Sequence, residues 1–220
     1  MHIPKKFRQE DLSTLKKLIV EAPFAVLITN SKKGLDATHL PFILEEAEGK
    51  TFLQGHVAKA NPLWQNVDDQ AEVLVVFNGP NCYVSPNYYP TKKEHGKAVP
   101  TWNYVCVHVK GVVSFIDDDD WNLQMLNTLT TVHEASQKKP WSVADAPKEH
   151  IQKMLPAIVG IEINVSSIIG QWKLSQNQPV QNQQGVIEGL SKEANGLSQE
   201  CVVSNSQKIA ELVQEYMLKS

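Results

Sequence analysis

The sequence predicts a small β-barrel of the α+β class, and three observations lead to that prediction. Six or seven short segments have the alternating or β-branched pattern of strands, amphipathic helices are interspersed among them, and no internal repeat occurs. With 220 residues, 42% of them hydrophobic, the chain can bury a core without a disulfide or a metal. We therefore expect six or seven mainly antiparallel strands with flanking helices.

The first half of the chain contains one helix and several strands. Leucine and isoleucine recur at helical spacing over residues 10–21, and Pro23 follows the last turn. The apolar run 73–77 predicts a strand buried on both faces, and Asn78-Gly79-Pro80 predicts a turn after it. The expected strands of this half are 24–29, 36–44, 51–56, 73–77 and 82–85.

The second half begins with a long polar loop. It spans residues 86–100 and contains a basic stretch at 92–97, which could contact phosphate, although a solvated mobile loop is the commoner outcome. Strands are expected at 105–115 and 158–165, with helices after Asp117–Asp120 and after Pro147. We expect a barrel domain over 1–169 and a C-terminal extension with an amphipathic helix over 170–220.

Composition excludes several classes of protein. With 21 Lys and Arg against 24 Asp and Glu, the net charge of -3 disfavours sequence-independent DNA binding. No dinucleotide-binding glycine motif, P-loop or zinc-protease motif is present. Three scattered cysteines without a CxxC pair predict neither a zinc site nor a disulfide framework, and they suit a reducing compartment. Without a signal peptide or membrane-length apolar run, we expect a cytoplasmic protein without a membrane span.

Polar residues gather where several expected strands end. Gly55 permits close backbone approach, and His56, Lys59 and Asn61 offer cationic and amide donors beside a helix expected to begin near Pro62. Such a turn could hold a monophosphate. Alternatively, Asn61 only caps the helix and Lys59 is solvated.

The other clusters also have two interpretations each. Trp102 and Asn103 could flank a planar heterocycle and bind its edge, or the Trp could simply be buried. His39, beside Thr38, could contribute to a site or be a hydrogen-bonded core residue. The four aspartates 117–120 could hold a metal, but stabilisation of a helix N-terminus explains them better. We predict no metal site and assign no catalytic residue.

Taken together, the clusters resemble one family, the PaiB-type negative transcriptional regulators, which are FMN-binding split-barrel proteins. The opening His2-Ile3-Pro4-Lys5-Lys6-Phe7 is similar to the family's Y-I-P-x-x-F, with His in place of Tyr. The resemblance continues in order over about 175 residues. Its further segments are Thr38–Pro41, Gly55–Pro62, Phe77–Pro80 with Tyr83–Pro86, Val99–Tyr104 with His108, and Lys173–Asn177.

The resemblance implies a split β-barrel related to pyridoxamine phosphate oxidases and flavin reductases, which are homodimers with FMN at the subunit interface. It assigns cofactor contacts to ten residues. Those in the first half of the chain are Thr38, His39, Gln54, His56, Lys59 and Asn61, with the Ala58–Asn61 turn at the phosphate. Those in the second half are Trp102 and Asn103 near the ring, and Lys173 and Gln176.

The chain departs from the family pattern at Gln178, where a basic residue is usual. FMN sites often use arginine, and Arg8 lies outside every cluster. A site built from Lys and His binds phosphate less well, so we expect FMN, or a related phosphorylated small molecule, to bind weakly or to be absent.

The resemblance predicts a negative transcriptional regulator that senses a ligand or redox state. One alternative is an FMN-dependent oxidoreductase or flavin reductase, in which His56 or His108 could donate a proton. Another is a haem-handling split-barrel protein, although nothing in the sequence selects a haem ligand. Direct DNA binding is unsupported, because no helix-turn-helix spacing or basic recognition helix is present.

Overall fold

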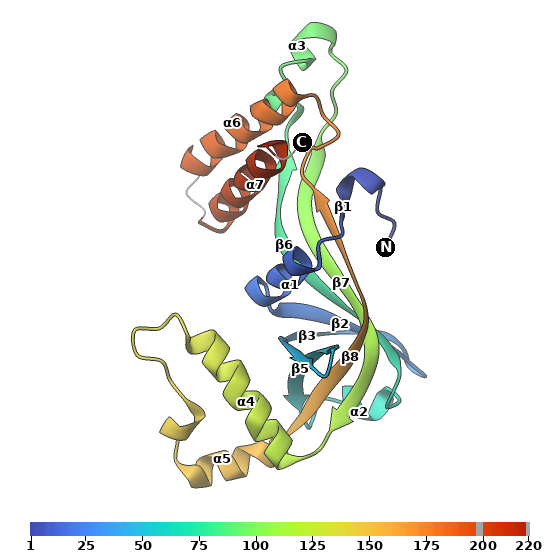
Figure 1. Ribbon diagram of the computed structural model, residues 1–220, viewed down its shortest axis with the longest axis vertical. Helices are drawn as coiled ribbons and strands as arrows, with labels where there is room; N and C mark the ends of the chain where they lie inside the picture. The colour runs from blue at the N-terminus through green and yellow to red at the C-terminus, as the bar shows by residue number, and fades with distance from the viewer. Residues whose placement is uncertain (197–199, 219–220) are drawn as a thin grey trace. The chain divides into compact units, whose positions relative to one another are not determined.

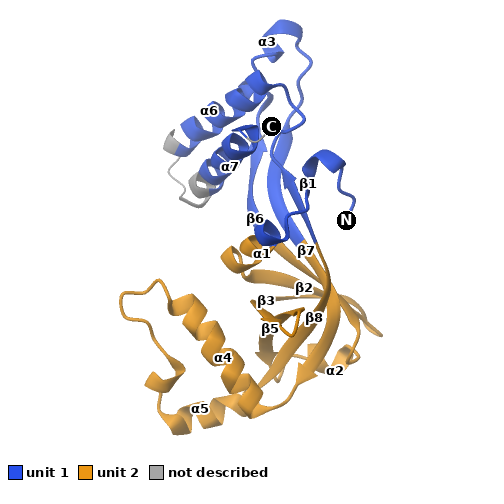
Figure 2. Cartoon of the chain, in the orientation of Figure 1, with its two compact units in different colours: residues 1–15, 78–107, 169–220 blue, residues 16–77, 108–168 orange. Residues whose placement is uncertain are grey.

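The computed structural model describes residues 1–196 and 200–218, and the chain divides into two compact units (Figure 2). Unit 1 comprises residues 1–15, 78–107 and 169–220, and unit 2 comprises residues 16–77 and 108–168. Three long strands run from one unit into the other. They are β6 (Glu72–Val84), β7 (Thr101–Ile116) and β8 (Ile158–Lys173).

Unit 2 contains most of the sheet. Its own strands are β2 (Phe24–Ser31), β3 (Gly34–Pro41), β4 (Ile43–Ala47) and β5 (Lys50–Ala58). The strand order is β3-β2-β6-β7-β8-β5-β4 (Figure 1). Antiparallel registers align Val26 with Val76 and Gly55 with Ile161. The buried members of each strand alternate with partly exposed ones, as expected for a sheet with one core face.

The sheet of unit 2 curls so that β3 and β5, from opposite ends of the strand order, come into contact. A Cβ on Gly55 would lie 2.8 Å from the carbonyl oxygen of Pro41, so only glycine permits this approach. The close approach that Gly55 permits is therefore to the chain's own backbone, and no ligand is needed to explain the glycine. The curled sheet is the predicted barrel.

Four helical segments of unit 2 lie between β7 and β8 in the chain. The helix α4 (Asp119–Glu134) packs Met125 and Leu129 against Ile43 of β4. The Asp118 carboxylate accepts a hydrogen bond from the Trp121 N–H at 2.7 Å and caps α4, as the helix interpretation of the aspartates predicts. The remaining segments are η3 (Val143–Asp145), α5 (Lys148–Met154) and η4 (Leu155–Ala157). A single turn, α2 (Leu63–Asn66), follows β5.

Unit 1 contains a short strand, two long helices and one end of each of the strands β6, β7 and β8. Strand β1 (Arg8–Gln9) is antiparallel to β8, between η1 (Lys5–Phe7) and the helix α1 (Leu12–Glu21). The loop after β6 contains η2 (Pro86–Tyr88) and α3 (Lys92–His95). Helices α6 (Val180–Gly196) and α7 (Glu200–Leu218) lie side by side (Figure 1). Their buried residues include Val186, Leu190, Ile209 and Val213.

Several expected boundaries were wrong. The predicted turn at Asn78-Gly79-Pro80 lies inside the continuous strand β6, where the buried positions change from odd to even numbers. Residues 73–77 are not buried on both faces, since Leu74 and Val76 are partly exposed. Pro41 ends β3, so the segment 36–44 contributes to two strands rather than one.

The segment after Lys173 is rich in Gln and Asn, and most of it is the helix α6. Asn182 and Gln183 are buried and donate their backbone N–H groups to the Pro179 carbonyl at 2.8 and 3.1 Å. Residues 169–220 group with two other segments in unit 1. That 170–220 forms a separable extension stays a prediction.

Within residues 1–196 and 200–218, none of the helices combines the length and the apolar character that crossing a membrane requires.

Candidate functional site

The ten predicted contact residues fall into two groups, one in each unit, and each group is described by itself. Unit 2 contains the residues predicted from the first half of the chain: Thr38, His39, Gln54, His56, Lys59 and Asn61. Unit 1 contains those from the second half: Trp102, Asn103, Lys173 and Gln176.

The predicted phosphate turn of unit 2 has its polar groups engaged within the chain. The Lys59 ammonium lies 2.7 Å from both carboxylate oxygens of Asp117. The Asn61 side chain accepts from the Leu63 N–H at 2.9 Å, which is the capping role, and α2 is too short to provide a helix field. Because the Lys59 and Asp117 side chains are 37% and 53% exposed, this pair contributes about 0–1 kcal/mol and a phosphate could compete for the lysine.

Thr38 and His39 lie on β3, at the end of the strand order. His39 is exposed, so the interpretation as a core histidine was wrong. Its ring centroid is 6.2 Å from that of Phe24, whose side chain is 65% exposed. Residues 34–37 are exposed on both faces of the strand. This edge therefore presents aromatic and imidazole groups together with unpaired backbone groups.

Gln54 and His56 share one face of β5. Gln54 donates from its amide to the Glu162 carboxylate at 2.7 Å, and His56 lies opposite Gly160. His56 Nδ1 is buried without a hydrogen-bond partner among the described residues. Helix α4 covers this place, because a Cβ on Gly160 would lie 2.3 Å from the Trp121 ring.

Asn122 is a candidate site residue that sequence reasoning missed. It is 1% exposed, and neither its Oδ1 nor its Nδ2 has a partner within the described parts of the chain. Its Oδ1 would lie 2.7 Å from a Cβ on Gly160, so Asn122 and His56 both adjoin this glycine. Buried polar atoms are normally paired, so these two atoms are available to form hydrogen bonds with a ligand. The sequence offered one signal for Asn122, because an asparagine there lies among the apolar positions of an amphipathic helix.

Asn122→Leu should stabilise the protein. Two unpaired amide atoms are expensive to bury, whereas leucine has the same branched arrangement of heavy atoms and no polar atom. We expect the free energy of unfolding to rise by about 1–2 kcal/mol, measured by urea denaturation. Asn127→Leu, at an exposed position of α4, is the matched control and should give no such increase. A loss of stability in Asn122→Leu would show that the amide is paired in solution.

The stability of unit 2 should fall in acid because of His56. Burial lowers the pKa of His56 from 6.5, so the unfolded chain binds a proton that the folded state disfavours. Unfolding free energy should therefore decrease as the pH drops below about 6.5. His56→Gln should flatten this decrease, as measured by denaturation between about pH 8 and about pH 5. His150→Gln, at an exposed position, should retain the slope of the unchanged protein.

Two residues of the group in unit 1, Asn103 and Lys173, line a small polar cavity of about 170 Å³. Asn103 is fully buried and donates to the Ser175 hydroxyl at 3.0 Å. The Lys173 ammonium donates to the Trp102 carbonyl at 2.7 Å and to the Thr101 hydroxyl. Burial lowers the pKa of Lys173. This cavity therefore combines one half-buried cation with an ordered amide–hydroxyl pair.

An aromatic surface occupies the face of β7 opposite Asn103. Trp102 is 54% exposed, so the interpretation as a buried Trp was wrong. Its ring makes an edge-to-face contact with Tyr83 at 6.2 Å between centroids, and the Lys173 ammonium lies 6.0 Å from the centroid of Tyr104. An exposed indole beside a cation suits a planar, electron-poor ring.

Gln176 has a structural role in unit 1. Its side chain accepts from the Leu174 N–H at 2.7 Å and donates to the Trp172 carbonyl at 2.6 Å. These bonds close the chain around Ser175, whose φ of 65° is unusual for a residue other than glycine. Gln176 therefore fixes the turn beside Lys173.

A flavin mononucleotide needs an aromatic contact, donors for its ring edge and cations for its phosphate. Within unit 1, Trp102 offers the aromatic contact and Lys173 offers a cation. Within unit 2, His56 offers a ring nitrogen, Nδ1, that has no hydrogen-bond partner among the described residues. Arg8 makes its ion pair with Glu10 at 3.8 Å. Each unit, taken by itself, thus contains residue types that a flavin site uses, and the available cations are lysines rather than arginines.

Comparisons with known proteins agree with this assignment. A family model described as "Putative FMN-binding domain" matches residues 1–167. "Protease synthase and sporulation protein PAI 2" of Bacillus subtilis (strain 168) is 30% identical over 219 residues, covering 100% of this chain and 99% of that protein. An uncharacterized protein of Emericella nidulans is 30% identical over 226 residues, covering 86% of this chain and 90% of that protein.

Solved structures show the same fold at low sequence identity. The flavocytochrome Anf3 from Azotobacter vinelandii has a TM-score of 0.55 at 12% identity, covering 78% of this chain and 72% of that chain. The FAD and heme binding protein from Mycobacterium smegmatis has a TM-score of 0.55 at 15% identity, covering 76% of this chain and 73% of that chain. The predicted split-barrel fold is confirmed. The chain belongs to the FMN-binding domain family, as a PaiB-type protein.

Proposed function

We propose that this protein is a cytoplasmic, homodimeric FMN-binding regulator that represses transcription by sensing a ligand or redox state. The observation that carries the proposal is the 30% identity to the Bacillus subtilis protein over essentially the whole of both chains. A relationship of that length includes both units, so it supports a shared role for the complete chain. The FMN-binding match over residues 1–167 supports the ligand.

The exposed edge of unit 2 supports a homodimer. Phe24 and Leu35 are 65% and 79% exposed, and β3 has one side without a strand partner in the sheet. Proteins generally cover or charge such an edge to prevent uncontrolled association. A second copy of the chain covering β3 would bury both side chains and pair with the same surface on its partner.

The charges of the site support weak binding of FMN. Lysine gives a phosphate a point charge, whereas arginine gives two parallel hydrogen bonds. Lys59 would also have to leave Asp117 before it could bind phosphate. The flavin, when bound, supplies reversible one- and two-electron transfer, and the surrounding residues set its position and electrostatic environment.

The regulatory action is proposed to be indirect. The net charge of -3 gives little attraction to the DNA backbone. A protein partner or a change in a small-molecule pool would then connect the ligand to transcription. A promoter mobility-shift assay should show no complex at any salt concentration. Transcript levels should nevertheless rise when the gene is deleted.

The decisive experiment is a titration of the purified protein with FMN, followed by measurement of its mass in solution. We expect saturable binding, at least about tenfold weaker for riboflavin, which lacks the phosphate. The mass should be twice the 24.6 kDa of one chain. Absence of FMN binding would overturn the cofactor proposal, and a monomeric mass would overturn the dimer.

A second candidate function is an FMN-dependent oxidoreductase. The observation that favours it is the buried, unpartnered Nδ1 of His56, a group able to donate or accept a proton. The protein loaded with FMN would then oxidise NAD(P)H, and His56→Gln would lower the rate at saturating FMN by a larger factor than it lowers FMN affinity. Loaded protein without such oxidation would favour the regulator.

A further inference from the structure

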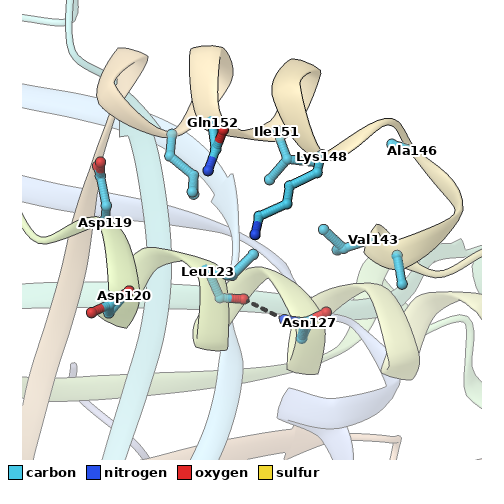
Figure 3. A pocket seen from close by; sticks show the side chains of 11 residues that line it. Asp119, Asp120, Leu123, Asn127, Val143, Ala146, Lys148, Ile151 and Gln152 are labelled. Atoms are coloured by element: carbon cyan, nitrogen blue, oxygen red, sulfur yellow. Dashed lines mark hydrogen bonds between the residues drawn. The ribbon is translucent and has the colours of Figure 1, made fainter.

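A cavity in unit 2 lies between α4 and the segment that contains η3, α5 and η4 (Figure 3). Its volume is about 640 Å³, within the range of about 300–1,000 Å³ that is typical of small-molecule sites. None of the ten predicted flavin contacts lines it. The cavity therefore needs an explanation separate from the flavin.

Apolar side chains form much of the wall on both sides. Leu123 comes from α4, and Val143, Ile151 and Leu155 come from the facing segments (Figure 3). Val143 and Leu155 are buried by their own surroundings, so the wall is ordered rather than formed by mobile tips. An apolar body placed between these residues would remove surface from water on both of its faces.

One cation extends into this apolar space. The Lys148 side chain runs from the start of α5 across the cavity, and its ammonium is directed toward Leu123 and Asn127 (Figure 3). In the described parts of the chain, no carboxylate forms an ion pair with it. An ammonium without an ion-pair partner in contact, beside an apolar wall, is complementary to an organic anion with an apolar body.

Two carboxylates restrict the charge of that anion. Asp119 and Asp120 line the same cavity, at the first turn of α4 (Figure 3). These three charged side chains have a net charge of -1, so a negative group is favoured only where it lies at the Lys148 ammonium and away from both carboxylates. A second negative charge on the same ligand would have no cation beside it. A phosphate or a dicarboxylate is therefore disfavoured relative to a monoanion.

We propose that this cavity is a second ligand site, which binds a compact amphipathic monocarboxylate. The carboxylate pairs with Lys148, and the apolar body lies between Leu123 and Ile151. The site is formed within one chain and does not depend on the flavin proposal, so FMN binding and occupancy of this cavity can be tested separately.

The first test uses two fluorescent probes of similar shape. 8-Anilinonaphthalene-1-sulfonate is a monoanion, and N-phenyl-1-naphthylamine is its uncharged analogue. Lys148→Gln should weaken the anionic probe at least about threefold and leave the neutral probe unchanged. Lys153→Gln, also on α5 but outside the cavity lining, should leave both affinities unchanged. Ala146→Trp, which fills the cavity, should weaken both probes.

The second test displaces the anionic probe with three eight-carbon competitors. Octanoate should displace it, whereas octanedioate and octanamide should compete at least about threefold less well. Thermal unfolding of each variant shows whether the fold is retained. Equal loss in Lys148→Gln and Lys153→Gln, or equal competition by the three compounds, would overturn the proposal. Unchanged probe binding in a folded Ala146→Trp variant would overturn it as well.

Discussion

Replacing Lys173 with methionine should weaken FMN binding by about ten- to a hundredfold. Among the lysines assigned to the site, Lys173 is the one whose pKa is lowered by burial, whereas Lys59 has a carboxylate partner at the surface. A hydrogen bond from a half-buried cation is stronger than one from a solvated cation, because less water competes for it. Methionine keeps the apolar stem and removes the charge. Fluorescence quenching of FMN measures the change.

The control must separate a ligand contact from a structural role, because Lys173 also binds the Trp102 carbonyl and the Thr101 hydroxyl. Lys173→Arg keeps the charge and the donors, so it should retain most of the affinity. Lys110→Met removes an exposed lysine of β7 and should have no effect. If riboflavin affinity falls as much as FMN affinity in Lys173→Met, the lysine contacts the ring or supports the fold rather than the phosphate.

The order of strands and helices could be predicted because each depends on local patterns. Alternating valines in β7 and helical spacing in α4 both survive in the structure. The predictions were wrong where contacts between residues distant in the sequence determine the local structure. At Asn78-Gly79-Pro80 the composition favours a turn, but pairing with neighbouring strands holds the chain extended and only the buried side changes. In α6 the buried amides concealed a helical pattern.

The candidate site was less predictable than the fold, since a residue type does not disclose its partner. Lys59 and Gln54 look equally available in the sequence, yet Asp117 and Glu162 already engage them. Asp117 is far from Lys59 along the chain, and only the barrel brings the two together. The unpaired atoms of Asn122 could not be anticipated either, because they result from packing against β8 at Gly160. The sequence therefore identified side chains that could contact a ligand, but it did not reveal which of them already have partners within the protein.

Replacing Gly185 with alanine should destabilise the protein by about 3 kcal/mol. In an ordinary helix this change stabilises by about 0.5–1 kcal/mol, because alanine is the better helix former. Here a Cβ on Gly185 would lie 2.0 Å from the carbonyl oxygen of Tyr88, so α6 must move away from η2. The sign of the effect thus reports whether α6 is packed against η2 in solution, as urea denaturation would measure.

Two further variants identify the clash as the cause. Gln181→Ala, at an exposed position of α6, should change stability by less than about 0.5 kcal/mol. At Gly189, one turn further along, an added Cβ would meet the Tyr88 ring at 2.3 Å. Tyr88→Ala removes that ring, so it should rescue Gly189→Ala, but it cannot rescue Gly185→Ala, where the obstacle is backbone. If Gly185→Ala stabilises the protein instead, α6 is not docked on this turn and the C-terminal segment is a separable extension.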